Sequence, residues 1–166
     1  MPLISAWSSV TAILGVALVI GMPESAQRPG DELKGLSSLG VVVEDLGSQA
    51  VSCGLNQAAL ETAVAKSLSD AGLKVLRNSD EDTYLYVNVN STKLSKAVCV
   101  SRYDVILYTH TTARLPYGST PALVQVSLLR EGGMAGGAPA ANAEGVLRDV
   151  KRAADAFASQ IRDANK

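Results

Sequence analysis

The chain has 166 residues, of which 47% are hydrophobic, with 15 basic and 16 acidic side chains. Its length suits one domain that can bury a core of its own. Every Lys and Arg follows residue 27, and removal of a leader that contains Glu24 would leave 15 charges of each sign. A neutral domain lacks the basic surface with which proteins bind nucleic acid or anionic lipid. We therefore expect no nucleic-acid partner.

An uncharged apolar run, VTAILGVALVIGM, occupies residues 10–22. It is short for a membrane span and typical of the apolar core of a secretory signal. The sequence predicts a cleavable signal peptide over residues 1–26 and export to the periplasm or the medium. The alternative is an uncleaved anchor in the inner membrane through residues 10–22, because no basic residue precedes the run. We expect the protein to contact the membrane only if this N-terminal segment stays uncleaved. Residues 27–35 are polar, contain Pro29 and Gly30, and are predicted to be a linker.

Two cysteines follow the leader, Cys53 and Cys99. In an oxidising compartment a pair of this kind predicts one disulfide. Two buried thiols, or a reactive thiol at Cys53 just before a helix, are the alternatives. Two Cys and the single His110 do not supply the four ligands of a structural zinc site, so no metal or cofactor is predicted.

The strongest pattern lies between Cys53 and Leu76. Apolar residues recur at helical spacing there, with Asn56 as the N-cap and Gly72 as the C-terminal stop, followed by a short strand over residues 74–76. Residues 39–46 precede this helix as a buried strand, and a loop over residues 47–54 joins the two. A turn is expected over residues 78–82.

Three further strands follow, over residues 83–92, 97–113 and 122–129, each with alternating apolar residues. The small-residue segment 132–145 is expected to be a loop, and residues 146–164 an amphipathic helix. The predicted fold is α+β: a two-layer sandwich, with a mostly antiparallel sheet of about five strands and two helices on one face, in a single domain over residues 36–166.

Alternation places Leu85, Val87 and Val89 on one face of the sheet. If the helices cover that face, the opposite face carries a group of large side chains: Tyr84, Tyr86, Ile106, Tyr108 and Leu123. Aromatic residues on an uncovered sheet are typical of partner-binding surfaces. The alternative is that tyrosine is present for its strand propensity alone. The predicted function is binding of a protein partner, or of a second copy, without catalysis.

Two other functions are alternatives. A small hydrolase or thiol-dependent enzyme would use His110 or Cys53, with Ser101 and Asp104 near His110 in the sequence, although no GxSxG turn accompanies them. A small-ligand carrier would need an apolar pocket between helix and sheet, which a sequence does not reveal. The glycines of residues 132–137 lack the Gly-Lys-Ser/Thr of a phosphate-binding loop.

Several segments together resemble a group of small exported bacterial proteins of unknown function. They include CGLNQAALETAVAKSLSDAGLKVL, DTYLYVNVNSTKL and LRDVKRAADAFASQIRDANK, and the resemblance covers residues 36–166. It implies export and the β-α-β-β-β-β-α order, and it transfers no catalytic residue. More distantly, the arrangement is similar to the N-terminal modules of periplasmic envelope-assembly factors, in fold only.

Overall fold

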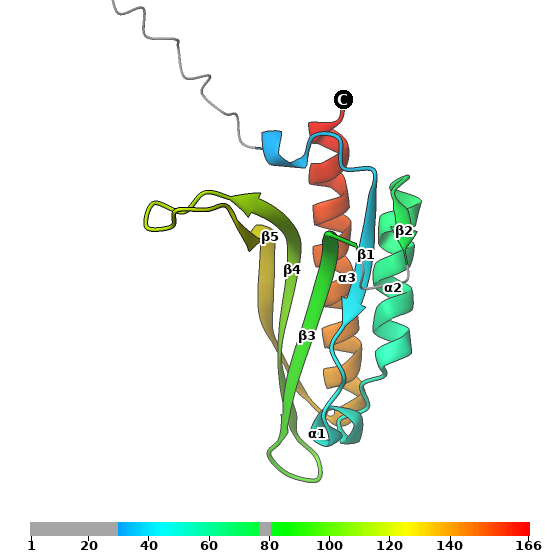
Figure 1. The fold of residues 1–166 in the computed structure, drawn as a ribbon. Helices are drawn as coiled ribbons and strands as arrows, with labels where there is room; N and C mark the ends of the chain where they lie inside the picture. The colour runs from blue at the N-terminus through cyan, green and yellow to red at the C-terminus, as the bar shows by residue number, and fades with distance from the viewer. Residues whose placement is uncertain (1–29, 77–80) are drawn as a thin grey trace, which may run out of the picture.

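The computed structural model describes residues 30–76 and 81–166 and contains one five-stranded sheet, in the order β2-β1-β3-β4-β5 (Figure 1). The predicted signal peptide and anchor lie outside the described residues, as does part of the predicted turn at 78–82. The strands are β1 (Ser38–Val43), β2 (Lys74–Leu76), β3 (Thr83–Lys93), β4 (Cys99–Ala113) and β5 (Ala122–Gly137). Strand β1 pairs in parallel with β2 and β3, whereas β3, β4 and β5 form an antiparallel meander.

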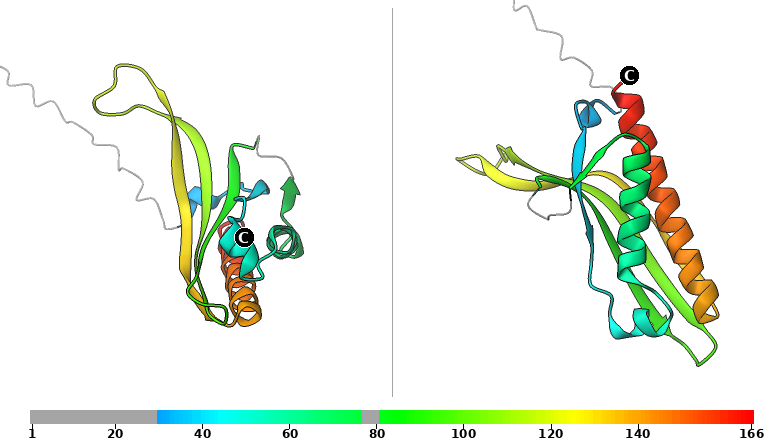
Figure 2. Two further views of the ribbon diagram at one scale, coloured as in Figure 1. Left: turned by 90° about the horizontal axis from the view of Figure 1, so that it is seen from below. Right: turned by 90° about the vertical axis from the view of Figure 1, so that its right-hand side faces the viewer.

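Two long helices, α2 (Gln57–Asp70) and α3 (Pro139–Ala164), lie on the same face of this sheet and leave the other face uncovered (Figures 1 and 2). The predicted two-layer α+β sandwich is therefore confirmed. The sheet is more evenly mixed than predicted, because the two pairings of β1 are both parallel. A parallel crossover through α2 connects β1 to β2, and the hairpins after β3 provide the antiparallel half.

Local signals fix both ends of α2. The side chain of Asn56 accepts a hydrogen bond from the N–H of Ala59 at 2.9 Å, as expected of an N-cap. Gly72 has φ +87°, and the N–H of Leu73 donates to the carbonyl of Leu68 at 3.1 Å. That is the left-handed stop predicted from the sequence.

The core lies between the helices and the sheet, and the predicted alternation of β3 decides which side chains enter it. Leu85 and Val87 are fully buried, as are Val64 of α2 and Phe157 of α3, which has 1% of its surface exposed. Each such side chain contributes about 1.5–3 kcal/mol on burial. This one-sided core orients β3, because a shift of one residue would turn its tyrosines inward.

The segment predicted as a linker belongs in part to the domain. Residues Asp31–Leu33 form a short 3₁₀ helix, η1, and Leu33 is 1% exposed within the core. Asn165, just after α3, holds this segment: its side chain donates to the carbonyl of Leu33 at 3.1 Å and accepts from the N–H of Gly35 at 2.7 Å. The linker prediction is wrong for residues 30–35, because a polar sequence with one apolar anchor gives no local sign of docking.

The loop predicted over residues 132–145 is also wrong. Strand β5 continues to Gly137, and α3 begins at Pro139. Residues 132–137 pair with residues 99–104 of β4, so a neighbouring strand supplies the hydrogen bonds that favour extension. Alanine is the best helix former and proline suits a first helical turn, which accounts for the early start of α3. The predicted loop at 47–54 likewise contains a short helix, α1 (Ser48–Ser52).

A disulfide joins Cys53, at the end of α1, to Cys99, at the start of β4. Their Cα atoms are 5.9 Å apart and both side chains are fully buried. The predicted bridge is confirmed. The reactive-thiol alternative is contradicted, since the described residues include no free cysteine.

The upper part of the β4–β5 hairpin forms an arm that bends away from the helix layer (Figure 2). We call residues 109–126 the arm. Its base coincides with a register shift between Leu107 and Tyr108, and such irregularities bend a strand and increase its twist. The arm thereby projects beside the uncovered face of the sheet.

Candidate binding surface

The uncovered face, called the open face below, is built from side chains of four strands in register. Tyr84 of β3 lies opposite Tyr108 of β4, and Tyr86 lies opposite Ile106. The next strand on one side adds Val42 beside Tyr86, and β5 on the other side adds Arg130 beside Ile106. Because paired residues project from the same face of a sheet, these side chains form a continuous surface.

Aromatic rings form a chain across the centre of the open face. The ring centroids of Tyr86 and Tyr108 are 6.0 Å apart, those of Tyr108 and Tyr84 are 5.9 Å apart, and those of Tyr84 and His110 are 5.8 Å apart. These separations are typical of tilted aromatic pairs. Gln125, from the arm, donates to the hydroxyl of Tyr84 at 2.6 Å. Contacts between neighbouring rings and this hydrogen bond therefore hold the Tyr84 ring in place.

The large side chains at the centre of the open face differ in how deeply they are buried. Ile106 is 6% exposed beneath the rings, whereas Tyr84, Tyr86 and Tyr108 are half-buried. Each tyrosine therefore keeps part of its side chain accessible. Rigid rings that are already held in place lose little conformational entropy when a partner covers them.

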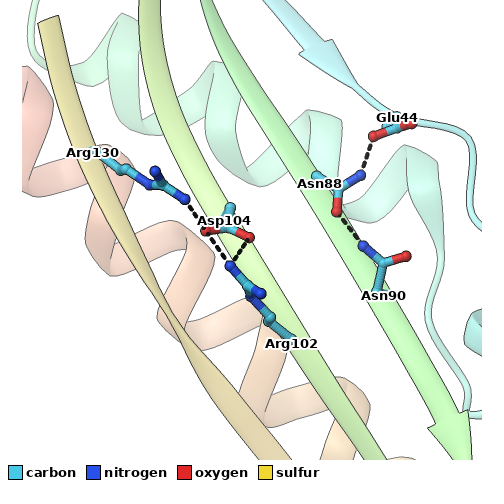
Figure 3. Close-up of polar contacts among 6 residues, drawn as sticks. All are labelled: Glu44, Asn88, Asn90, Arg102, Asp104 and Arg130. Atoms are coloured by element: carbon cyan, nitrogen blue, oxygen red, sulfur yellow. Dashed lines mark hydrogen bonds and ion pairs between the residues drawn. The ribbon is translucent and has the colours of Figure 1, made fainter. Parts of the chain in front are cut away.

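One polar group on the open face is centred on Asp104 of β4, whose side chain is only 19% exposed (Figure 3). Arg102 and Arg130 reach it at 3.2 and 3.1 Å, from β4 itself and from β5. Two guanidinium groups against one carboxylate leave an excess positive charge on this side. Both arginines are more than half exposed, so they remain available to a partner.

A second polar group lies on the other side, at Glu44 just after β1. The side-chain amide of Asn88 donates to its carboxylate, and Asn90 donates to Asn88 (Figure 3). The hydroxyl of Tyr86 donates to the same carboxylate. These donors hold the pKa of Glu44 below its usual value, with the Tyr86 hydroxyl as the largest cause and Asn88 as the second. The same contact raises the pKa of Tyr86. The open face is therefore negative near β1 and positive near β5.

The Glu44 contacts predict a pH effect. The folded pKa of Glu44 lies below its ordinary value of 4.5, so its contribution to stability is complete above about pH 5 and is lost as the pH falls through the folded value. Tyr86→Phe should raise the pKa of Glu44, so that the stability of the variant falls less steeply as the pH drops. NMR titration of the Glu44 side chain measures the shift in its pKa. Tyr84→Phe is the matched control, because it removes a tyrosine hydroxyl from the same face and leaves the contacts of Glu44 unchanged.

The open face brings together four of the residues expected there from the sequence: Tyr84, Tyr86, Ile106 and Tyr108. The fifth, Leu123, projects from the same face but on the arm, opposite Thr112, where it is 73% exposed. It flanks the aromatic chain and does not belong to it.

Sequence reasoning missed several polar members of this surface as site residues. Glu44 and Arg130 come from segments far from the tyrosines in sequence, and only the pairing of β1 and β5 with the meander places them nearby. Asn88 lies an even number of residues from Tyr86, and Arg102 and Asp104 lie an even number from Tyr108, so alternation puts all three on the tyrosine face. The sequence therefore contained the signal that places these three residues on the open face, but it did not show the contacts that they make with neighbouring strands.

The structure separates the residues of the hydrolase alternative. Ser101 is fully buried on the helix side of the sheet, where it contacts Ser91 at 2.7 Å and Asn142 at 2.9 Å. His110 lies on the open face, and its side chain makes no hydrogen bond or ion pair with a described residue. A nucleophile and a base on opposite faces of a sheet do not come within hydrogen-bond reach.

A cleft of about 370 Å³ lies between α2 and the β1–β2 edge. Its lining mixes apolar side chains with Glu61 and Thr62, and no described residue identifies a ligand in it. The ligand-carrier alternative therefore stays a prediction. Among the described residues, no three His, Cys, Asp or Glu side chains are grouped so as to hold a metal ion.

Comparison with protein-family models found no matching family, and comparison with curated proteins found no matching sequence. Within residues 30–76 and 81–166, no helix combines the length and the apolar character needed to cross a membrane.

Proposed function

We propose that this chain is an exported, non-catalytic domain of the cell envelope that binds a protein partner through its open face. The observation that carries the proposal is the row of rings Tyr86–Tyr108–Tyr84–His110 on a sheet face that none of the described helices or strands covers. Tyrosine and arginine are enriched at the centres of protein interfaces. The open face contains both types, and Lys does not occur among its central residues.

The flanking charges support the same function. The face is negative at Glu44 and positive at Arg102 and Arg130, which favours a partner with the opposite pattern and fixes its orientation. A buried disulfide supports export, because such bonds persist in oxidising compartments. The resemblance to small exported bacterial proteins supports the same location, in the periplasm or outside the cell.

The test replaces Tyr84 and Tyr86 together by Ser. We expect this variant to lose its cross-linked complex in the envelope of the native host, because truncation of central aromatic residues typically costs about 2 kcal/mol or more of binding free energy. Tyr117→Ser is the matched control: Tyr117 is 87% exposed in the loop at the tip of the arm, outside the open face.

Two readouts make the outcome decisive. Thermal unfolding of the three proteins establishes that the variants are folded, and quantitative cross-linking compares their complexes. Loss of the complex in both variants, or in neither, would contradict the proposal. If the complex is lost and proves to contain only this chain, the partner is a second copy.

A further inference from the structure

The two polar groups of the open face lie at one height along the strands. Asn88 is opposite Asp104, and Asp104 is opposite Gly132, so these residues share a height on β3, β4 and β5. Glu44 reaches the same height on the β1 side, because its N–H continues the pairing of β1 with β3 by donating to the carbonyl of Val87 at 2.9 Å. The acid and the arginine-bound carboxylate therefore lie on opposite sides of the face at equal height (Figure 3).

The net charges of the two groups have opposite signs. Glu44 accepts hydrogen bonds from neutral donors only, and it forms no ion pair with a described residue. Arg102 and Arg130 share the single carboxylate of Asp104 and lie on either side of its height. The β1 side therefore has one negative charge without a cation, and the β4–β5 side has one positive charge in excess.

A second copy supplies the opposite pattern when it is turned by 180° about one particular axis. Sheets that pack face to face with aligned strands lie about 10 Å apart, and a two-fold axis between them runs either along the strands or across them. Rotation about an axis along the strands, between β3 and β4, exchanges β3 with β4 and β1 with β5 and keeps every residue at its height. Glu44 then faces the arginines of the second copy. Rotation about the other axis brings like edges together, so the charges favour the first axis.

The centre of the open face also matches itself about this axis. Because β3 faces β4 of the second copy, residues that pair within one sheet also face each other between the two sheets. Tyr84 faces Tyr108 in this way, and Asn90 faces Arg102. A ring lies on a ring and an amide lies against a guanidinium group, so the rotation brings no like charges together at the centre.

The position that receives Glu44 has room for it. At the height of Glu44, the strand that faces β1 of the second copy is β5, and the residue there is Gly132. A Cβ at this position would lie 3.1 Å from a carboxylate oxygen of Asp104. The absence of a side chain leaves space above the strand, beside Arg130, for the carboxylate of the second copy.

The area of the open face suits such a contact. With strands about 4.8 Å apart and a rise of about 3.4 Å per residue, β3, β4 and β5 over the 11 residues of β3, together with β1, cover about 600 Å² in projection. Side chains make the accessible area of a face larger than its projection, and a stable interface buries roughly 800 Å² of each partner. The arm begins at residue 109, above all of these pairs, and projects on the side of the second copy (Figure 2).

We propose that the protein forms a two-fold symmetric dimer through its open face, with the axis along the strands between β3 and β4, and with Glu44 of each copy against Arg130 of the other. This inference rests on the proposed function, because it uses the same face. It goes further in naming the partner, a second copy of this chain, and the way in which the two copies are turned.

The test uses two charge reversals that repair each other. Glu44→Arg should weaken the dimer about a hundredfold, because like charges then meet at both equivalent contacts, at a cost of about tenfold each. Arg130→Glu should weaken it equally. An equal mixture of the two variants should form a heterodimer of wild-type affinity, since both of its contacts again join opposite charges. Sedimentation of the disulfide-bonded protein, purified from its native host, measures the dissociation constants, and native mass spectrometry identifies the heterodimer.

Two further variants complete the design. Glu61→Arg, the same reversal on α2 outside the open face, is the matched control and should leave the dissociation constant unchanged. Glu44→Arg/Arg130→Glu in one chain should dimerise as the wild-type protein does, and it tests the contact even if a single variant does not fold. Thermal unfolding establishes which variants are folded.

Each other outcome overturns the dimer in a way that separates it from the proposed function. A wild-type protein that stays monomeric up to about 0.1 mM excludes a second copy as the partner. A complex with a different protein that depends on Tyr84 and Tyr86 would then leave the proposed function intact, and absence of any such complex would remove both. A dimer that neither reversal weakens, or that the mixture does not restore, would contradict the proposed axis.

Discussion

Loss of the Cys53–Cys99 disulfide should lower the free energy of unfolding by about 4 kcal/mol. The bridge closes a loop with a sequence separation of 46 residues, and the loss of chain entropy that such a loop imposes on the unfolded state has about this size. A domain of this length is typically stable by about 5–15 kcal/mol. The bridge thus supplies a large share of the total, and the reduced protein should be close to unfolding at 37 °C.

Denaturant titration with and without a reducing agent measures this effect. The Cys53→Ala/Cys99→Ala variant should have the free energy of unfolding of the reduced protein, apart from the cost of two small buried cavities. Reducing agent should leave the stability of this variant unchanged. A reduced protein as stable as the oxidised one would contradict the entropic argument. It would also remove the reason to expect this protein in an oxidising compartment.

Gly133→Ala should destabilise the protein by about 1–3 kcal/mol, although alanine normally improves on glycine in a strand. A Cβ at position 133 would lie 2.5 Å from the hydroxyl oxygen of Tyr103 and 2.9 Å from the ring carbon that bears it. Tyr103 is 5% exposed, and its burial also raises the pKa of the phenol. A rigid ring held in this way cannot move aside without disturbing its packing against α3.

Gly136→Ala is the matched control on the same strand. A Cβ there meets its nearest neighbour, the carbonyl oxygen of Cys99, at an ordinary 3.5 Å. This variant should be neutral or slightly more stable, because alanine restricts the unfolded chain. Thermal or urea unfolding compares the two.

A double-mutant cycle with Tyr103→Leu isolates the cause. Once the ring is removed, Gly133→Ala should cost little, and the coupling between the two positions should approach the penalty of the single variant. Additive effects would show that the penalty arises elsewhere, for instance from the strand geometry itself.

The sequence by itself determined the elements whose signals are local. The apolar stripe of α2, its Asn56 cap and its Gly72 stop are short-range features, and the structure has each of them. Alternation along β3 and β4 likewise determined which side chains enter the core, because a strand has only two faces. The two cysteines admitted one pairing, and it is the one present.

Only the tertiary structure decided the features that depend on a neighbouring segment. Residues 132–137 have no periodicity, yet they are a strand because β4 pairs with them. Leu33 is buried because Asn165 holds its segment in place. The same holds for the candidate site: the tyrosines were visible on one face of two strands, but Glu44 and Arg130 joined them only through strand pairing. Strand pairing is non-local, and its hydrogen bonds leave no periodic trace in the residues that make them.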